Sequence, residues 1–334
     1  MPSRVEHPEG IGFSTQSVHA GEEKAKPHGS LTTPIYQTST YCFEDTAALV
    51  AHMQRKEQGL EPLRGEYGRY GNPTQATVER KLAALEGAER ALVLASGMAA
   101  ATCTFLTFLS AGDHYILTAD CYRKTRQFSL EVMSRMGIDC TLVPLGDLGA
   151  LESAIRPNTR LIFSETPTNP YLRVVDLPRL AEIARKHDVL TLIDTTFATP
   201  YNLRPLEHGI DLVIHSATKY FGGHNDLLAG VVAGSAEHVA QVREMNNMIG
   251  AVGDPHMVYL LLRGLKTLGL RIERHNRNGQ QVAEFLAAHP LVEHIWYPGL
   301  PSHPDHEIAT RLMRGFGGVV TFELDTDLEG TARF

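Results

Sequence analysis

From residue 91 onwards, short apolar runs alternate with segments that have the spacing of amphipathic helices. The apolar runs lie at about residues 91–94, 114–118, 141–143, 161–163, 189–193, 211–214 and 227–233. Helical spacing lies between several of them, as at Leu180, Ile183 and Ala184. Strands that are buried on both faces read as continuous apolar runs, and a helical crossover brings the next strand back parallel to the last. The sequence therefore predicts an α/β fold with a mainly parallel sheet.

The first 65 residues differ from this pattern. They are rich in Gly, Pro, Thr and Gln, and only residues 45–58 have the character of a short helix. A segment of this composition buries little apolar surface of its own. We therefore expect residues 1–65 to form an arm on another surface of the same protein or of a neighbouring subunit. A large domain is predicted to follow over residues 66–265.

The last part of the chain, residues 266–334, is predicted to be a smaller α+β domain. Its expected elements are a long helical region over residues 255–289 with a break near Gly264 or Gly269, strands over residues 292–297 and 318–324, and a helix over about residues 304–313. Two strands are marginal as a sheet, so we expect this domain to be incomplete.

Charge and composition argue against several classes of function. A net charge of −7 and a pI near 6.1 argue against nucleic acid as a partner. No apolar run reaches the ~18 residues that a membrane span needs, and the polar N-terminus lacks a signal core. The four cysteines are scattered without a CxxC pair, which favours reduced, buried thiols. His303 and His306 lack the partners of a metal motif, so we interpret them as exposed histidines. We expect a cytoplasmic protein without a metal site.

The strongest candidate for chemistry is Lys219, which follows the apolar run at residues 211–214. Open α/β sheets bind ligands at the carboxyl ends of their strands, although a lysine there is more often an ordinary surface residue. Asp194 ends another apolar run, and a carboxylate at the end of a buried strand is unfavourable unless a cation satisfies it. The alternative interpretation of Asp194 is that its side chain caps a turn or a helix, since Thr195 and Thr196 follow. A lysine in a desolvated crevice commonly holds a carbonyl cofactor as a Schiff base.

Pyridoxal phosphate would need further groups near that lysine. Gly97 and Met98 open a helix directly after a predicted strand, where free N–H groups can bind a phosphate. Ser216 and Thr218 flank the lysine and could add hydroxyl donors. Tyr122 could stack on the ring, although such a residue is more often a core or interface tyrosine. Each signal is weak alone, but together at strand ends they favour pyridoxal phosphate.

Six motifs of the chain resemble those of the Cys/Met-metabolism family of pyridoxal-phosphate enzymes. They are YGRYGNPT at residues 67–74, ASGM at 95–98, DCY at 120–122, ETPTNP at 165–170, IDTTFATP at 193–200 and SATK at 216–219. That family holds cystathionine γ-synthases, cystathionine and methionine lyases, and homoserine-ester sulfhydrylases. Residues 120–126, 223–230 and 297–304 look most like cystathionine γ-synthases of the plant type. The resemblance runs over nearly the whole chain and implies fold type I, with a sheet of the seven-stranded type.

The resemblance also implies a role for each site residue. Lys219 would bind the cofactor and move protons, and Asp194 would pair with the pyridine nitrogen. Tyr122 would stack on the ring, Thr196 would lie near its other face, and Asn169 would contact the phenolic oxygen or the substrate carboxylate. The phosphate would be held by Gly97, Met98, Ser216 and Thr218. Tyr67 and Arg69 would reach the phosphate of a neighbouring subunit, which implies a dimer, usually paired into a homotetramer. Thr195 departs from the family, where asparagine is common.

The activity that the resemblance implies is γ-replacement, in which an O-activated homoserine and cysteine give cystathionine. A γ-lyase, a sulfhydrylase and a cofactor-binding remnant without turnover remain as alternatives. Family members continue for some tens of residues past Phe334, and that stretch carries the arginine for the substrate α-carboxylate. Which homoserine ester is used stays open. One of Arg123, Lys124 and Arg126 could meet an anionic leaving group, or all three could lie on a solvated helix face.

Overall fold

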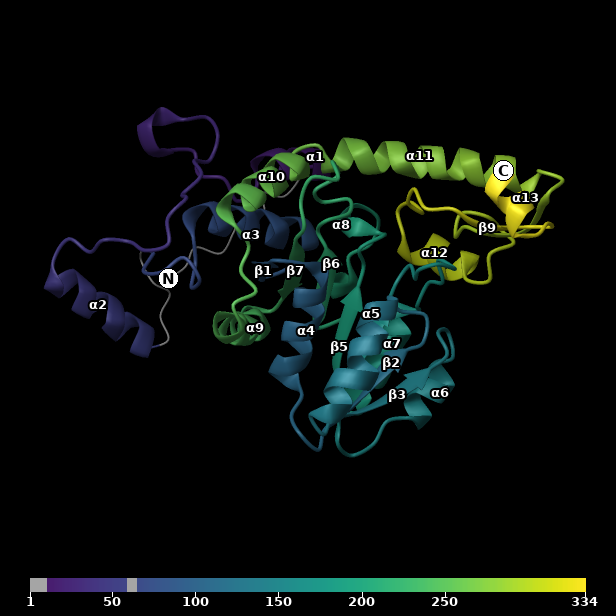
Figure 1. The fold of residues 1–334 in the computed structure, drawn as a ribbon, viewed down its shortest axis with the longest axis horizontal. Helices are drawn as coiled ribbons and strands as arrows, with labels where there is room; N and C mark the ends of the chain where they lie inside the picture. Colours follow the sequence, from purple (N-terminus) through teal and green to yellow (C-terminus); the bar gives the residue numbers. More distant parts are fainter. Residues whose placement is uncertain (1–10, 59–64) are drawn as a thin grey trace.

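The computed structural model describes residues 11–58 and 65–334 of the chain. Within them, one mixed sheet has the strand order β1-β7-β6-β5-β4-β2-β3 (Figure 1). Its strands are β1 (Arg90–Leu94), β2 (His114–Thr118), β3 (Asp139–Val143), β4 (Thr159–Glu165), β5 (Leu190–Asp194), β6 (Leu212–Ser216) and β7 (Gly230–Gly234). The neighbours are parallel except that β7 runs antiparallel to both β1 and β6. The predicted mainly parallel, seven-stranded α/β fold is confirmed.

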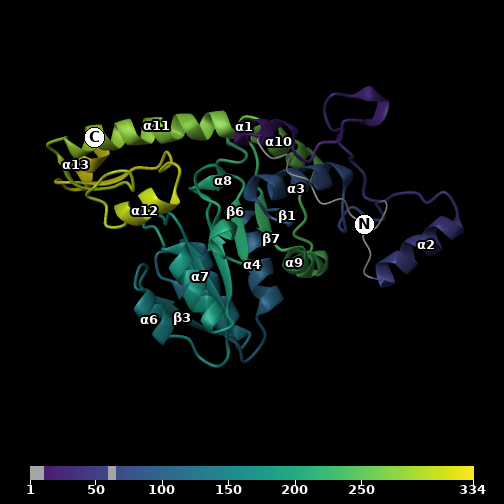
Figure 2. The ribbon, with the colours of Figure 1, turned by 180° about the vertical axis from the view of Figure 1, so that it is seen from behind.

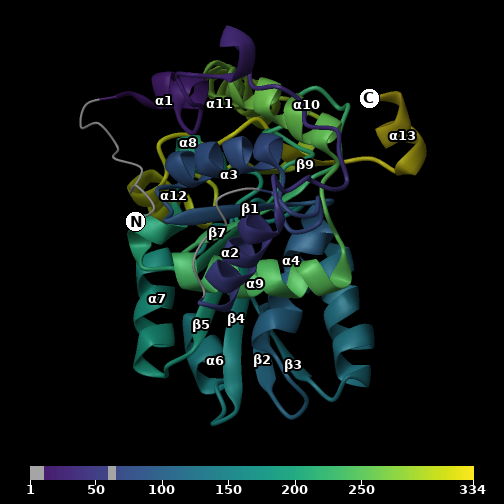
Figure 3. The same ribbon diagram turned by 90° about the vertical axis from the view of Figure 1, so that its left-hand side faces the viewer.

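Helices cover both faces of this sheet, as Figure 3 shows in side view. One face packs against α4 (Gly97–Phe108), η2 (Phe128–Met133) and α9 (Ala236–Ile249), and the other against α3 (Pro73–Glu86), α6 (Leu148–Ser153), α7 (Leu177–Lys186) and α10 (Pro255–Leu265). Successive strand residues alternate between the two layers: Leu192 packs on the first face and Ile193 on the second. Both faces are apolar for this reason, which explains why the strands read as continuous apolar runs.

Several shorter elements complete the large sheet region. They are α5 (Arg123–Gln127), α8 (Thr199–Asn202) and the 3₁₀ turn η3 (Pro205–His208). The sequence suggests one helix after Tyr122. In the structure, α5 continues directly into a π-helical segment, η2.

The N-terminal arm contains a helix that the sequence does not reveal, α1 (Phe13–His19). This helix packs on α3 and on α11 (Leu268–Ala287) of the same chain. The arm continues through a 3₁₀ turn, η1 (Pro27–Gly29), to the expected helix α2 (Thr46–Glu57), which projects away from the sheet in Figure 1. Part of the arm thus lies on its own subunit, while its contact with a neighbouring subunit stays a prediction.

The C-terminal part begins along the long helix α11, which a break after Leu265 separates from α10. It then contains β8 (Val292–Trp296), α12 (His306–Leu312), β9 (Thr321–Leu324) and α13 (Leu328–Arg333). The strands β8 and β9 pair antiparallel in a small separate sheet, and Figure 2 shows this region below the far end of α11. A small C-terminal α+β region is therefore present, and the residue limits of the domains stay a prediction.

The histidines of this region differ from the expectation. His303 is 3% exposed, and its ring bonds the Tyr171 carbonyl at 3.2 Å and accepts the Asp305 N–H at 3.2 Å. His306 bonds the Pro298 carbonyl at 2.8 Å. The prediction that both are exposed is wrong: His303 is buried and His306 is half-buried, because both rings form hydrogen bonds to the backbone of neighbouring loops.

Two further expectations concern the cysteines and membranes. Cys103 and Cys121 are buried as expected, whereas Cys42 is exposed and Cys140 is half-buried. Across the described residues, none of the helices has the length and apolar character to cross a membrane.

Candidate active site

The carboxyl ends of neighbouring parallel strands meet at one edge of the sheet. Glu165 ends β4, Asp194 ends β5 and Ser216 ends β6. The register pairs Glu165 with Asp194, and Asp194 with Ile214, two residues before Ser216. Three consecutive strands thus deliver polar side chains to the crevice where open α/β sheets bind ligands.

Lys219 lies in the turn that follows β6 at this edge. The Lys219 N–H donates to the Ser216 carbonyl at 3.1 Å, and the Gly222 N–H donates to the Ala217 carbonyl at 2.8 Å. These bonds fix the backbone of the turn, while the Lys219 side chain is exposed. The backbone position of Lys219 is therefore fixed, whereas its side-chain amine can move.

Asp194 is half-buried and is hydrogen-bonded to its own turn. Its Oδ1 accepts the Thr196 N–H at 2.9 Å and the Thr196 hydroxyl at 2.6 Å. No cation lies within ion-pair distance of Asp194 among residues 11–58 and 65–334. Burial raises the pKa of this carboxyl, and the hydrogen bonds from Thr196 act in the opposite direction. The carboxylate does cap a turn, but that turn leaves its charge without a counter-ion.

Thr196 also ties the ends of β5 and β6 together. Its hydroxyl oxygen accepts the Ser216 N–H at 2.8 Å while the hydroxyl donates to Asp194. Asp194 and Ser216 are therefore linked through one side chain, which sequence spacing alone does not indicate.

The N-terminus of α4 lies directly beside Ser216. A Cβ on Gly97 would be 2.8 Å from the Ser216 Cβ, and a Cβ on Gly230 would be 2.0 Å from the Ser96 carbonyl oxygen. The two glycines thus allow the turn between β1 and α4 to approach the ends of β6 and β7. The Ser96 hydroxyl caps the helix by accepting the Ala99 N–H at 3.1 Å.

This arrangement leaves the first N–H groups of α4 available at the site. The first intrahelical bond is donated by Ala100 to the Ser96 carbonyl at 3.1 Å, so the N–H groups of Gly97 and Met98 precede it. Free N–H groups and the positive end of the helix dipole make such a terminus suitable for a phosphate. Met98 also contacts α5 through its sulfur, which lies 3.7 Å from the Thr125 hydroxyl.

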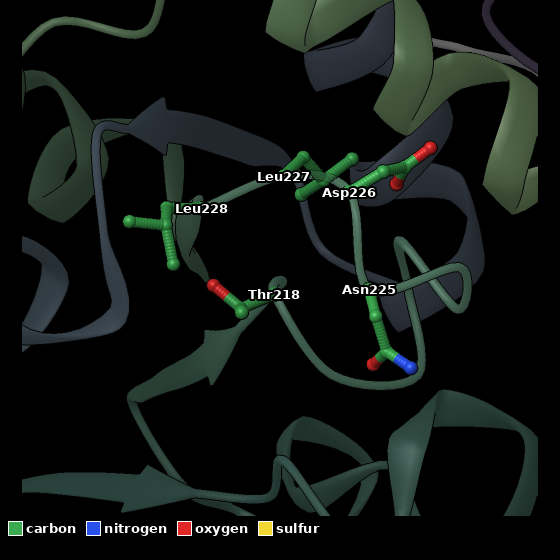
Figure 4. Close-up of a pocket in the computed structure, with 5 residues that line it drawn as sticks. All are labelled: Thr218, Asn225, Asp226, Leu227 and Leu228. Carbon is green, nitrogen blue, oxygen red and sulfur yellow. The ribbon is translucent and has the colours of Figure 1, made fainter.

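Thr218 fastens the lysine turn to the segment before β7. Its hydroxyl oxygen accepts the Ala229 N–H at 3.1 Å, and its own N–H donates to the Ala229 carbonyl at 3.3 Å. A hollow of about 450 Å³ is lined by Thr218 and residues 225–228, as Figure 4 shows. The hydroxyl of Thr218 thus faces open space while it orders its own loop.

Tyr122 and Asn169 lie in the loops that follow β2 and β4. Tyr122 is 47% exposed and Asn169 is exposed. The Tyr122 N–H donates to Glu165 Oε2 at 2.8 Å. Sequence reasoning did not single out Glu165. The feature that marks it as a site residue is its place at the end of a strand, in register with Asp194.

The structure places Tyr67 and Arg69 in a different group of contacts. The Arg69 guanidinium lies 5.2 Å from the Tyr67 ring centroid and 4.9 Å from that of Tyr70, and it donates to the Asn247 carbonyl at the end of α9. Arg69 is therefore held against α9 and Tyr67 against Arg69, and their predicted role at a neighbouring subunit stays a prediction.

Two of the three basic residues after Tyr122 bond within their own segment. Lys124 Nζ donates to Gln127 at 2.8 Å, and Arg126 donates to the Ala119 carbonyl at 3.1 Å. The contact of Arg126 orders the end of β2, and that of Lys124 follows the exposed face of α5. The contact of Lys124 fits a solvated helix face, whereas half-buried Arg126 is bonded to a loop carbonyl, and a role for any of the three basic residues at a leaving group stays a prediction.

Together these groups fit pyridoxal phosphate. The cofactor needs an amine for its aldehyde, a carboxylate for its ring nitrogen and donors for its phosphate. Lys219, Asp194 and the N-terminus of α4 supply these at one edge of the sheet. The lack of an ion-pair partner at Asp194 and the close approach of α4 to Ser216 that Gly97 allows are the two observations that carry the fit.

Comparison with known proteins agrees with this geometry. Residues 14–334 match the family model described as Cys/Met metabolism PLP-dependent enzyme. Cystathionine gamma-synthase 1, chloroplastic, of Arabidopsis thaliana is 47% identical over 321 residues, which are 95% of this chain and 56% of the plant protein. L-methionine gamma-lyase of Fusobacterium nucleatum subsp. polymorphum is 41% identical over 95% of this chain and 80% of its own.

A solved structure shows the same fold. The crystal structure of metB from Corynebacterium glutamicum has a TM-score of 0.88 and 38% identity, and the match covers 95% of this chain and 80% of that one. The chain spans little more than half the length of its plant relative, and relatives with synthase and lyase names have similar identities. This chain belongs to the Cys/Met-metabolism family of pyridoxal-phosphate-dependent enzymes.

Proposed function

We propose that this protein is an enzyme of the cystathionine γ-synthase type, which replaces the γ-substituent of an O-activated homoserine by cysteine to give cystathionine. The grouping of Lys219, Asp194 and the α4 N-terminus at one sheet edge supports amino-acid chemistry with pyridoxal phosphate. The 47% identity to a plant cystathionine γ-synthase supports γ-replacement. Activated homoserine and cysteine are therefore the proposed substrates.

The proposed chemistry divides between the cofactor and the chain. Pyridoxal phosphate, when bound, supplies an electron sink for the negative charge that develops on the substrate. Lys219 holds the cofactor and, when the substrate amine has displaced it, takes and returns protons at the substrate carbons. Its exposed amine on a fixed turn can reach more than one atom.

The remaining site residues bind and orient. Asp194 keeps the ring nitrogen protonated, because a half-buried carboxylate without a counter-ion gains most from a bound N–H⁺. Tyr122 stacks on the ring and Thr196 lies near its other face. Asn169 contacts the phenolic oxygen or the substrate carboxylate.

The phosphate would be held by groups that the close approach of α4 and β6 brings together. They are the N–H groups of Gly97 and Met98 and the hydroxyls of Ser216 and Thr218. Both hydroxyls belong to the segment that also carries Lys219, so phosphate binding and lysine placement depend on the same turn.

Tyr67 and Arg69 are proposed to complete the phosphate site of a second copy of the chain. Both are part of the segment before α3, and Tyr67 is 38% exposed. A dimer with shared sites, paired into a tetramer, follows from this proposal.

Mixing two defective variants tests the shared site. Arg69→Ala and Lys219→Ala chains, unfolded together and refolded in equal amounts, should regain about a quarter of the wild-type activity, since half of the dimers are mixed and each then has one intact site. Activity no greater than the sum of the two separate variants would show that each site is built from one chain.

A lyase is the alternative activity that the relatives support. L-methionine gamma-lyase and cystathionine beta-lyase of Lactococcus lactis, at 41% and 43% identity, lie close to the synthases in similarity. Both activities need the same cofactor groups, so the site described above does not separate them. Product analysis separates them directly.

The proposed activity predicts a definite pattern of products. Acetyl-, succinyl- or phosphohomoserine with cysteine should give cystathionine at least about tenfold faster than cystathionine alone gives 2-oxobutanoate or pyruvate, a difference of about 1.4 kcal/mol in barrier height. Chromatography of the products measures all rates. Faster formation of an oxo acid would identify a lyase, faster use of sulfide a sulfhydrylase, and no turnover of the cofactor-loaded protein a binding protein.

A further inference from the structure

Glu165 is a buried acidic residue to which the proposed chemistry gives no role. It is 7% exposed at the end of β4, and the register places it opposite Asp194 at the end of β5. Residues paired in this way on parallel strands point to the same face of the sheet. Two carboxyl groups therefore lie side by side at the edge where the cofactor ring is proposed to bind.

The contacts of Glu165 are with backbone and not with a cation. Its Oε2 accepts the Tyr122 N–H at 2.8 Å. In the described part of the chain, no basic side chain lies within ion-pair distance of it. The residue thus acts as an acceptor for the loop after β2, and it ends the strand β4 from which the next loop begins.

This position is unfavourable for an acidic residue. Burial, and then the charge of Asp194, raise the pKa of Glu165 well above its usual value, and the N–H groups of Tyr122 and Asn169 act in the opposite direction. A residue that served only to fill the space would be apolar. What the carboxyl provides is an acceptor for the Tyr122 N–H.

The loop after β2 carries a side chain that has little other support. Tyr122 is 47% exposed. Its orientation at the site therefore depends on its backbone, and the backbone N–H of Tyr122 is bonded to Glu165. A shift of about 1 Å at a positioning residue can reduce activity on the order of a hundredfold.

We propose that Glu165 is a positioning residue of the cofactor site, which fixes Tyr122 by accepting a hydrogen bond from its backbone N–H. The inference rests on the proposed role of Tyr122 but not on whether the enzyme is a synthase or a lyase. Glu165 itself acts on the ring only through Tyr122.

The test compares variants that keep or remove the acceptor. Glu165→Ala leaves the Tyr122 N–H without a partner, whereas Glu165→Gln retains an acceptor oxygen of similar reach. Glu79 is the matched control, because it is a buried glutamate whose Oε1 accepts the Val93 N–H at 3.1 Å inside the sheet region. Glu79→Ala should lower stability without altering the cofactor.

The readouts need no substrate. Titration of the cofactor-free protein gives the dissociation constant for pyridoxal phosphate, and visible circular dichroism of the loaded protein reports the surroundings of the ring. We expect Glu165→Ala to weaken binding by about tenfold to a hundredfold and to reduce the dichroic signal per bound cofactor. Glu165→Gln should restore most of the affinity and most of the dichroic signal, and Glu79→Ala should change neither the affinity nor the signal.

Two results would overturn the proposal. One is wild-type affinity and dichroism in Glu165→Ala, and the other is equal impairment of the Ala and Gln variants, which would assign the effect to the charge. If Glu165→Ala does not fold, Glu165→Asp withdraws the acceptor by one methylene and gives the same comparison with Gln. A wild-type protein that binds pyridoxal phosphate with normal dichroism but forms no cystathionine would instead contradict the proposed function.

Discussion

Replacing Gly230 by valine should abolish tight binding of pyridoxal phosphate. Even the first atom of the new side chain would be 2.0 Å from the Ser96 carbonyl oxygen and 3.0 Å from the Gly97 nitrogen, both of them backbone atoms. The turn that begins α4 must therefore move away from β7. We expect a loss of affinity on the order of a hundredfold, together with about 1–3 kcal/mol of the free energy of unfolding.

A glycine elsewhere provides the control for this variant. Gly149 lies exposed in α6, and the nearest atom to a Cβ there is an Asp147 oxygen at 3.5 Å. Gly149→Ala should leave cofactor affinity unchanged and add up to about 1 kcal/mol of stability through helix propensity. Titration with pyridoxal phosphate and thermal unfolding measure both variants. Unchanged affinity in Gly230→Val would show that α4 does not bind the phosphate.

Replacing Lys219 by alanine should remove turnover with almost no effect on folding. The lysine side chain is exposed, so its loss should change the free energy of unfolding by about 0.5 kcal/mol or less. Loss of the group that moves protons alone should reduce kcat by about 10²–10⁴-fold. Exposed Lys186 on α7 is the control, and Lys186→Ala should keep wild-type turnover. A Lys219→Ala protein with more than about a tenth of wild-type kcat would contradict the proposed role.

The strands were predictable because their signal is local. Each is a short apolar run, and residues such as Leu192 and Ile193 are both buried because helices cover both faces of the sheet. The candidate site residues Lys219 and Asp194 could be proposed for the same reason, since each lies within a few residues of the end of such a run. Position after a buried strand is sufficient to place a side chain at the binding edge of an α/β sheet.

What sequence reasoning missed depends on contacts between distant residues. The helix α1 is short and polar, and its last turn is held by Lys81, whose Nζ donates to the Ser17 and Val18 carbonyls at 3.0 and 2.9 Å. Lys81 is fully buried within α3, more than sixty positions away. A lysine in an amphipathic segment gives no local sign of such a partner, so the helix it supports could not be predicted.

Glu165 was missed for a related reason. Its motif is visible in the sequence, but its importance comes from the register of β4 with β5 and from the N–H group of Tyr122, 43 positions earlier. The burial of His303 likewise follows from its bond to Tyr171, which lies in another part of the fold. Strand register and loop-to-loop hydrogen bonds are properties of the assembled chain.

The covalent attachment of pyridoxal phosphate to Lys219 tests the central claim most directly. Borohydride reduces the carbon–nitrogen double bond between a lysine and pyridoxal phosphate to a stable amine, so the modified lysine survives digestion. Mass spectrometry of the reduced and digested protein should find the phosphopyridoxyl group on the peptide that contains Lys219, and should find none in Lys219→Ala. The same group on a different lysine of the wild-type protein would contradict the account.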